Sequence, residues 1–385
     1  MYKRQIDNNG SVEILDDSVK ETLTEKINEM SDNALRVLGI AYKNTENIGD
    51  NVENDLIFTG LVGIIDPPKE NVDKSIAACK KAGIKVRMIT GDHLKTAASI
   101  AREIGILTDG KVIDGETLDK LSDEEYFEMV DNIQVYARVK PEQKMRIVET
   151  LKQKGEIVSM TGDGVNDAPA LKNASIGVAM GSGTDVAKES GDMIIQDDNF
   201  ETIVTAIREG RKIYDNIKRF VKFQVSTNVG AILTIVGTSI FMLPVPFNPV
   251  QLLWINIVMD GPPAQTLGME GSERNIMTRQ PETGDILNKK VLIKIFIAGL
   301  VMAIGSIALF SYKLAIGASQ KQAMTVAFTL FVMYQLFNAY NSKSNSAKKS
   351  TYLYLAIIAC FILQVLIVYI SCLLYTSPSP RDRQK

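Results

Sequence analysis

The chain has 385 residues, which is enough for more than one domain, and its formal net charge is −2 at pH 7. Because basic residues are dispersed among acidic ones, the composition gives no reason to expect nucleic-acid binding. The mean hydropathy of +0.03 conceals two unlike parts. The sequence is charged up to about Phe223 and is dominated afterwards by apolar runs, which approach the ~20 residues that cross a bilayer. We therefore expect a membrane protein with a cytosolic head.

The first predicted elements form a short segment that ends at a pair of prolines. A helical pattern at residues 19–30 precedes the apolar run ALRVLGIAY, which contains Arg36, and a strand pattern follows at residues 56–65. From spacing alone, Arg36 is best explained as a salt-bridged surface residue. Pro67 and Pro68 come next. Because each proline fixes φ and lacks a backbone donor, we expect a stiff hinge and a domain boundary there.

Between that hinge and residue 199, strand and helix patterns alternate. The expected strands are residues 84–89, 133–137, 156–160, 176–180 and 193–195, and the expected helices are residues 69–82, 93–104 and 141–154. Alternation of this kind predicts a doubly wound parallel sheet with helices on both faces. The sequence Gly181-Ser182-Gly183 precedes another helix, but it lacks the Gly-Lys-Ser/Thr ending of a phosphate-binding loop, so we interpret it as a tight turn.

The most distinctive stretch of the head is TGDGVNDAP, which begins at the end of a predicted strand. Asp163 and Asp167 lie in a loop that Gly162 and Gly164 open. Open α/β sheets bind ligands at the carboxyl ends of their strands. A pair of carboxylates there can hold Mg²⁺ through oxygen, with little steric hindrance from the glycines. For the GDG sequence alone, an ordinary Asp-Gly surface turn is at least as good an explanation.

Four side chains of the head follow, or lie near, the ends of different predicted strands: Thr90, Lys144, Asp163 and Asp167. A doubly wound sheet would gather them around one point. Thr90 can hydrogen-bond a phosphoryl oxygen, and Lys144 can neutralise its charge. Lys144 also lies in the first turn of its predicted helix, where the helix dipole disfavours a cation. A plain surface lysine is the alternative, but this unfavourable position favours a functional one.

The second half of the chain is expected to be helical and to cross the membrane about five times. One continuous helix is predicted from Glu201 to Leu243, which would span roughly 65 Å at 1.5 Å per residue. Further spans are predicted at residues 249–268, 291–312, 323–340 and 352–374. The connections after the second and fourth spans carry several lysines and arginines, so both should be cytosolic.

An acid inside an apolar span costs ~2.5–3.5 kcal/mol on insertion scales and is functional by default. Asp260 is the clearest case, and Asn256 lies one turn earlier on the same helix face. Pro262 and Pro263 would break the helix just after the acid and free backbone carbonyls. In the preceding span, Asn228 is the main additional ligand candidate. Oxygen from one carboxylate and from amides suits a hard divalent cation such as Ca²⁺.

Four motifs together resemble one family. TGDGVNDAP is similar to the hinge signature of P-type cation-pumping ATPases; DPPK, the TGD that starts at Thr90, and ARVKPEQK, which contains Arg138, also match that family. The resemblance implies an α/β haloacid-dehalogenase-like phosphorylation domain with a doubly wound parallel sheet. The remnant of an α+β nucleotide-binding domain would precede it, and an all-α transmembrane bundle would follow. The corresponding parts are residues 1–66, 67–199 and 200–376, while residues 377–385 resemble translated adapter sequence rather than a native tail.

The resemblance also implies a reaction, in which the γ-phosphoryl group of ATP passes to an aspartate, with Mg²⁺ as cofactor, and is then hydrolysed. The residues placed in catalysis are Thr90, Lys144, Asp163, Asn166 and Asp167. Those placed at the nucleotide are Arg36, Thr90, Gly91, Asp92, Arg138, Lys144 and Asn166. Asp163 and Asp167 would hold Mg²⁺, while Asn166 and Asp167 would also order the loop and the attacking water.

In this family the phosphorylated aspartate lies in an Asp-Lys-Thr-Gly-Thr motif far upstream of TGDGVNDAP. The chain contains no such motif. We therefore expect a missing N-terminal half of the same polypeptide to supply the nucleophile. We also expect this chain by itself not to pump.

Within the family, the membrane part most resembles Ca²⁺ pumps of the secretory-pathway type and their bacterial relatives. The two-ion sarcoplasmic-reticulum type has acids where this chain has Ala231 and Gln335, and a threonine where it has Met259. These departures imply one transported ion per ATP. The secretory-pathway type also handles Mn²⁺, and Gln265 lies in the matching PPAQ segment, so Mn²⁺ stays open. We expect a multi-pass protein of the cell membrane with its ATPase head in the cytoplasm.

Two other classes of protein remain open from the sequence. One is a phosphatase of the soluble type with a membrane anchor, although an anchor needs no polar residues inside its spans. The other is a non-catalytic remnant or regulatory membrane module, against which the intact acids of TGDGVNDAP argue. The expected partners are ATP, the cation, the lipid bilayer and the rest of the polypeptide.

Overall fold

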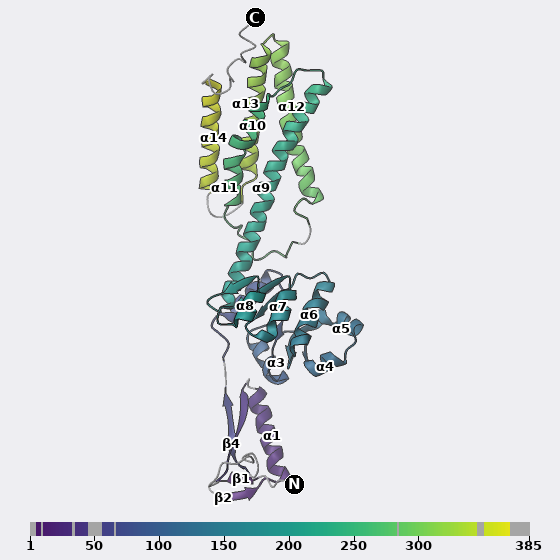
Figure 1. Ribbon diagram of the computed structural model, residues 1–385, viewed down its shortest axis with the longest axis vertical. Coiled ribbons are helices and arrows are strands. Elements are labelled where there is room, and N and C mark those ends of the chain that lie inside the picture. Colours follow the sequence, from purple (N-terminus) through teal and green to yellow (C-terminus); the bar gives the residue numbers. More distant parts are fainter. Residues whose placement is uncertain are drawn as a thin grey trace. The chain divides into compact units, whose positions relative to one another are not determined.

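The computed structural model describes residues 5–8, 11–32, 35–44, 56–64, 67–282, 285–344 and 350–369. They belong to two compact units, Met1–Thr205 and Ala206–Lys385, whose elements are labelled in Figure 1. Each unit has buried hydrophobic clusters of its own. The tail expected at residues 377–385 lies outside the described residues.

The first unit begins with a small mixed sheet and one helix. Its strands are β1 (Gln5–Asn8), β2 (Ser11–Ile14), β3 (Arg36–Tyr42) and β4 (Ile57–Ile64), in the order β2-β1-β4-β3, and its helix is α1 (Asp17–Asp32). β3 and β4 pair antiparallel, and α1 packs over them at Gly63, where a Cβ would lie 2.8 Å from the Met30 side chain. The helix and strand expected in this segment are confirmed.

The rest of the first unit is built on two three-stranded parallel sheets. One contains β5 (Met88–Ile89), β6 (Lys111–Asp114) and β7 (Ile133–Ala137) in the order β5-β7-β6. The other contains β8 (Ser159–Gly162), β9 (Ile176–Met180) and β10 (Met193–Ile195) in the order β10-β9-β8. The helices are α2 (Val72–Lys81), α3 (Leu94–Glu103), α4 (Gly115–Lys120), α5 (Asp123–Met129), α6 (Pro141–Gln153), α7 (Ala168–Asn173) and α8 (Asp185–Ser190). The expected parallel α/β architecture is therefore confirmed, with its strands divided between two sheets.

One hydrophobic core joins the two parallel sheets. Ile147 and Leu151 of α6 pack in the cluster beside β7, while Val148 packs in the cluster beside β8. Ile89 and Val158 contact both clusters. Within the described sheets β5 and β8 are edge strands, so the backbone hydrogen-bonding groups on one side of each strand have no strand partner there.

Two sequence-based strand boundaries in this region were wrong. The strand expected at residues 84–89 pairs only at Met88–Ile89, where Met88 is opposite Val135 and Ile89 is opposite Tyr136 of β7. The strand expected at residues 156–160 is displaced to Ser159–Gly162, where it pairs with β9. The short elements β6, α4 and α5 were not predicted.

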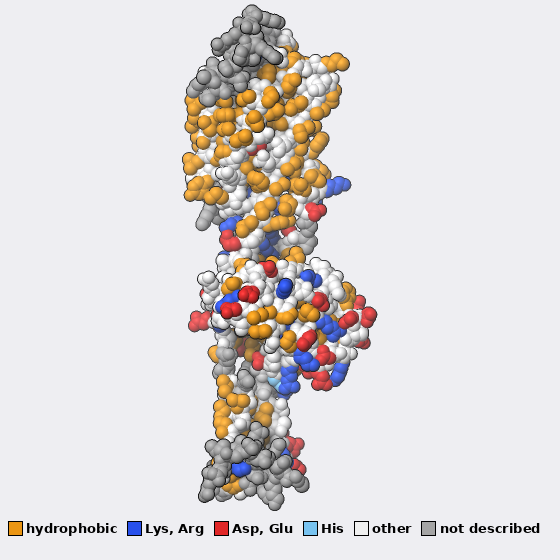
Figure 2. All heavy atoms as spheres, viewed as in Figure 1, with side chains coloured by type: hydrophobic (Ala, Val, Ile, Leu, Met, Phe, Trp, Pro, Cys, Tyr) orange, Lys and Arg blue, Asp and Glu red, His pale blue; other side chains and the backbone are white. Residues whose placement is uncertain are grey.

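The second unit is a helical bundle that begins within α9 (Phe200–Ile240), a helix that is continuous over 41 residues as expected. With α12 (Lys289–Ala315), α13 (Gln320–Asn341) and α14 (Thr351–Tyr369), it gives four helices in the described chain that are long and apolar enough to cross a membrane. Figure 2 shows hydrophobic side chains over most of the visible face of this unit. Such a surface is suited to lipid rather than to water.

The span expected at residues 249–268 is not a regular helix. It consists of α10 (Pro249–Leu253), a π-helical segment (Trp254–Met259) and α11 (Gly261–Gly268). The amide of Asp260 donates to the carbonyl of Ile255, five residues back, at 2.9 Å. Pro262 and Pro263 follow and have no N–H with which to continue the ladder. The described chain thus has four helices that are long and apolar enough to cross a membrane, and the span predicted at residues 249–268 is present as this interrupted segment.

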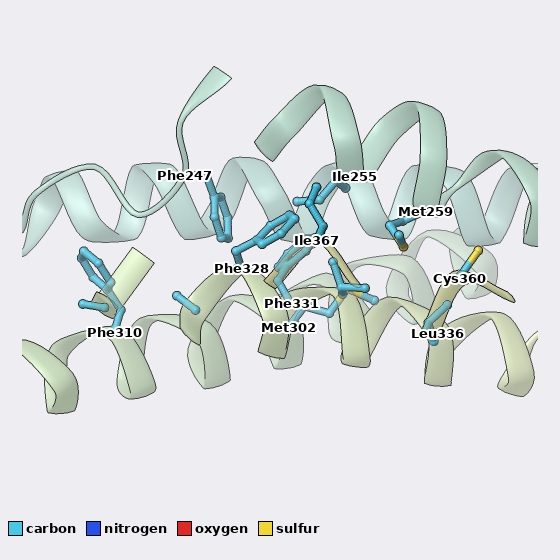
Figure 3. Packing of buried hydrophobic residues seen from close by; sticks show 13 residues of the cluster. Phe247, Ile255, Met259, Met302, Phe310, Phe328, Phe331, Leu336, Cys360 and Ile367 are labelled. Atoms are coloured by element: carbon cyan, nitrogen blue, oxygen red, sulfur yellow. The ribbon is translucent and has the colours of Figure 1, made fainter. Parts of the chain in front are cut away.

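The bundle packs around α13. Phe328 and Phe331 of this helix are fully buried, and Phe331 meets Phe247 edge to face with ring centroids 5.4 Å apart. Figure 3 shows these rings among buried side chains from α12, the π-helical segment and α14. Aromatic pairs of this geometry stabilise a core beyond their buried area.

The connection between α11 and α12 is fastened to the first half of α9 by ion pairs. The pairs are Arg279 with Asp215 at 2.7 Å, Arg219 with Glu273 and Lys218 with Glu282. The hydrogen bond from Lys218 lowers the pKa of Glu282. Asp215 and Glu270 are buried, and Glu270 accepts hydrogen bonds from the connection between α13 and α14. Three segments of the unit therefore meet at one charged junction.

Close packing of α9 and α12 yields a test of the bundle. A Cβ on Gly299 would lie 2.7 Å from Val229 and 3.0 Å from the Gly230 nitrogen, whereas a Cβ on Gly210 would meet nothing within 4 Å. Gly299→Ala should therefore destabilise the unit by ~1–3 kcal/mol through overpacking. Gly210→Ala should stabilise it by ~0.5–1 kcal/mol because it removes backbone entropy from the unfolded chain. Thermal unfolding in detergent, followed by the fluorescence of the single tryptophan, measures both; equal midpoints would contradict this packing.

Candidate functional site

Asp167 organises the acidic loop that follows β8. Asp167 is buried, with only 7% of the residue exposed. Oδ1 accepts a hydrogen bond from Lys144 Nζ at 2.6 Å, and Oδ2 accepts from the backbone N–H groups of Asp163 and Gly164 at 3.3 and 3.2 Å. Charge-assisted bonds of this kind are among the stronger ones in proteins. Asp167 therefore fixes the loop that carries Asp163.

Two glycines allow this loop its compact path. A Cβ on Gly162 would lie 2.4 Å from the Cβ of Asp167, and a Cβ on Gly183 would lie 2.8 Å from the carbonyl oxygen of Asp163. The same carbonyl accepts from Thr184 N–H at 2.8 Å. The Gly-Ser-Gly segment is thus a tight turn that packs against the acidic loop and supports the backbone of Asp163.

Lys144 reaches Asp167 from the first turn of α6. The helix begins at Pro141, and Gln143 accepts a hydrogen bond from the N–H of Lys140, its N-cap residue. The Lys144 side chain is 17% exposed. Its ammonium lies near a helix N-terminus, which disfavours a cation, and its ion pair with Asp167 offsets that cost.

The TGD turn after β5 forms a second cluster. Thr90 Oγ1 donates to Asp92 Oδ2 at 2.8 Å and accepts from the Asp92 N–H at 3.1 Å. The N–H of Arg138 donates to the carbonyl of Asp92 at 3.1 Å. Arg138 has φ of +49°, a strained conformation for a residue with a side chain. Gly91, Asp92 and Arg138 are exposed.

The structure therefore brings the predicted head residues together in two groups. Lys144, Asp163 and Asp167 form one group, and Thr90, Asp92 and Arg138 form the other; no hydrogen bond in the described residues links them. Both follow the carboxyl ends of parallel strands, as expected from the topology. Arg36 begins β3, but its side chain lies outside the described part of the chain.

The two acids of the loop differ in their availability to a metal ion. Asp163 and Asn166 are exposed, and the Asp163 carboxylate makes no ion pair among the described residues. Asp167 is occupied by Lys144 and two backbone donors. Across the described residues, no group of three or more His, Cys, Asp and Glu side chains is arranged to hold a metal. One free carboxylate fits Mg²⁺, which keeps several waters and binds one or two carboxylates together with phosphate.

In the membrane unit, Asp260 is fully buried. Gln335 of α13 donates its Nε2 to Asp260 Oδ1, and Gln224 of α9 donates its Nε2 to Oδ2 at 3.3 Å. Asn228 and Asn256, predicted to share a cation with Asp260, are exposed and make no hydrogen bond to it within the described chain. Sequence reasoning missed Gln224 and treated Gln335 as a lost ligand. The sequence did contain a signal for both residues, because Gln224 and Gln335 are polar residues within apolar runs.

Comparison with known proteins identifies both halves of the chain. A model of haloacid dehalogenase-like hydrolases matches residues 18–175, and a model of the cation transporting ATPase C-terminus matches residues 244–380. The chain belongs to the cation-transporting ATPases. The resemblance drawn from its motifs, and the fold class that followed from it, are thereby confirmed.

Similar curated proteins are named calcium-transporting ATPases. The Bacillus subtilis protein is 38% identical over 376 residues, which is 94% of this chain and 42% of the relative. Calcium-transporting ATPase 1 of Saccharomyces cerevisiae is 42% identical over 87% of this chain and 36% of its own length. Calcium-transporting ATPase type 2C member 1 of Bos taurus is 41% identical over 83% and 33%. The chain thus spans less than half the length of these relatives.

The ion pair between Lys144 and Asp167 can be tested by a double-variant cycle. Lys144→Met should destabilise the head by ~1–3 kcal/mol, because Asp167 stays buried without its cation. Lys144→Met combined with Asp167→Asn should cost less than the sum of the single changes. Hydrogen exchange of the β8 amides in urea measures both. Lys172→Met is the control, since Lys172 is exposed on α7; strict additivity at the Lys144 and Asp167 positions would contradict the coupling.

Proposed function

We propose that the polypeptide containing this chain is an ATP-driven pump that moves one Ca²⁺ ion per ATP across a membrane through an aspartyl-phosphate intermediate. The observation that carries the proposal is the presence, in one chain, of an acidic loop latched by Lys144 and of Asp260 buried in a broken membrane helix. The first suits phosphoryl transfer, and the second suits a cation. The names of the relatives support the same ion.

In the proposed head reaction, an aspartate oxygen attacks the γ-phosphorus of ATP and ADP leaves; water then attacks the phosphorus and releases inorganic phosphate. The hydroxyl of Thr90 and the ammonium of Lys144 would hold phosphoryl oxygens. Bound Mg²⁺ would neutralise developing phosphate charge, with Asp163 as its ligand from this chain. Asp167 would keep the loop in place, and Asn166 would orient the attacking water.

The two parallel sheets support a proposed position for the nucleophile. β5 leads into Thr90 and β8 leads into the acidic loop, and both are edge strands of the described sheets. A further parallel strand between them would pair with both edges and end beside Thr90 and Asp163. We propose that the rest of the polypeptide supplies that strand together with the aspartate.

Nucleotide binding is assigned to the exposed side of the head. Gly91, Asp92 and Arg138 lie together at the TGD turn and would contact ATP, as would Arg36.

We place the pump in the cell membrane, with the head in the cytoplasm. Mn²⁺ is a second proposed cargo, because the carboxylate oxygens of Asp260 suit both cations. An anchored phosphatase is disfavoured, since it would have no use for a buried acid with two amide partners.

The proposal that the rest of the polypeptide supplies the phosphorylated aspartate can be tested with labelled ATP. This chain alone should form no acid-stable phosphoenzyme, whereas the completed polypeptide should form one, because the chain has no Asp-Lys-Thr-Gly-Thr motif. Asp163→Ala in the completed polypeptide should abolish turnover by removing the Mg²⁺ ligand. Glu189→Ala, at an exposed acid of α8, is the control. A phosphoenzyme on the chain alone, or normal turnover in Asp163→Ala, would refute the assignment.

The cation site can be tested through Asp260. Asp260→Asn should lose cation-dependent phosphorylation from ATP, because the charge that holds the ion is gone. Phosphorylation from inorganic phosphate should survive, since it needs the head but no bound ion. Transport in sealed vesicles should give one Ca²⁺ per ATP. Unchanged Ca²⁺ dependence in the variant, or a ratio of two, would overturn the proposal.

A further inference from the structure

The carboxylate of Asp260 lies between two glutamine amides. Gln335 Nε2 donates to one oxygen and Gln224 Nε2 donates to the other, at 3.3 Å. The glutamines come from two helices, α13 and α9, while Asp260 ends the π-helical segment. Each carboxylate oxygen therefore has a neutral amide donor, and no lysine or arginine forms an ion pair with Asp260 within the described residues.

The amide of Gln335 is satisfied on one side only. The residue is fully buried, and its Nε2 also approaches the carbonyl oxygen of Ile255 at 3.5 Å. Its Oε1 is buried and has no hydrogen-bond partner. An unpaired buried acceptor is costly, because it has given up water and received nothing in exchange. Such an atom calls for an explanation beyond packing.

The chemistry of the amide group explains why the Oε1 atom of Gln335 can stay unpaired. The last torsion of glutamine is broad and roughly two-fold, so rotation by about half a turn exchanges the NH₂ group and the oxygen at little cost. With NH₂ forward, the amide donates to a bare carboxylate. With Oε1 forward, it presents the neutral oxygen ligand that Ca²⁺ and related hard cations accept beside a carboxylate.

The geometry points to a two-state cation site made of Asp260, Gln335 and Gln224. In the ion-free state both amides donate N–H to the carboxylate and hold its charge. When a hard divalent cation binds Asp260, the amides turn and their oxygens ligate it. Two neutral ligands leave the charge of the site unchanged, which agrees with a single divalent ion. This inference rests on the proposed transport function and adds two ligands to it.

The test is equilibrium binding of ⁴⁵Ca²⁺ to the purified full-length protein. Gln335→Leu removes both the donor and the oxygen, and should weaken Ca²⁺ binding about tenfold or more. Gln335→Glu keeps an oxygen in place but removes the donor, and should bind Ca²⁺ close to wild type. The pair Gln224→Leu and Gln224→Glu should behave in the same way.

Gln364→Leu is the matched control. Gln364 is also a fully buried glutamine of the bundle, but its oxygen accepts from Trp254 and its nitrogen donates to Thr329. Its replacement should leave Ca²⁺ binding unchanged. Phosphorylation from inorganic phosphate reports whether each variant folds, and Gln335→Met replaces Gln335→Leu if the latter fails that check.

The outcomes separate a ligand from a mere hydrogen-bond donor. Suppose that Gln335 only donates a hydrogen bond to Asp260. Gln335→Glu then loses that donor, as Gln335→Leu does, and adds a second negative charge that repels the Asp260 carboxylate. It must therefore bind Ca²⁺ as weakly as Gln335→Leu, or more weakly. That result, or unchanged binding in Gln335→Leu, overturns the inference while leaving the pump intact. A wild-type protein that binds no Ca²⁺ would instead refute the proposed function, and the inference with it.

Discussion

Burial of Asp260 imposes the constraint on which the membrane unit depends. A charged or polar group without access to water must have its bonding capacity filled from within the protein. The helix that carries Asp260 widens into a π turn and is followed by Pro262 and Pro263, so its backbone departs from regularity at the acid. Side-chain amides from α9 and α13 donate hydrogen bonds to the Asp260 carboxylate. The buried acid at this break is thus satisfied only because α9 and α13 direct Gln224 and Gln335 into the bundle.

The first unit also buries a carboxylate, and it stabilises that carboxylate in a different way. Asp167 is nearly as buried as Asp260, but it takes a full charge partner, Lys144, and two backbone N–H groups. Such a carboxylate is fixed rather than free. Its neighbour Asp163 is left exposed on a backbone that Gly162 and Gly183 allow to pack closely. Rigid support for one acid therefore leaves the other available, as the proposed metal-assisted phosphoryl transfer requires.

The charged junction on α9 concerns the mechanics of the helix. Asp215, Lys218 and Arg219 hold the connection between α11 and α12, and that connection follows directly the helix of Asp260 and its prolines. Glu270 extends the junction to the segment before α14. A displacement along α9 would therefore be transmitted, through several bonds at once, to the connection that follows the broken span and to the segment before α14. Individually such pairs stabilise little, but a partly buried network is stiffer than its members.

Sequence alone was enough to predict the parallel α/β head, the long α9, the family and the acid inside an apolar run, Asp260, because periodicity, glycine-rich motifs and a charge in an apolar run are local signals. Sequence reasoning also predicted that Lys144 and Asp163 belong to the site. It did not predict that Lys144 and the Asp163 N–H both bind the Asp167 carboxylate, because that depends on which donors the fold brings to each oxygen. Tertiary structure alone divided the strands into two sheets, shortened the strand before Thr90 and exposed Asn228 and Asn256. It also brought Gln224 and Gln335 to Asp260 from 36 and 75 residues away, because contacts between helices have no signature in the spacing of either one.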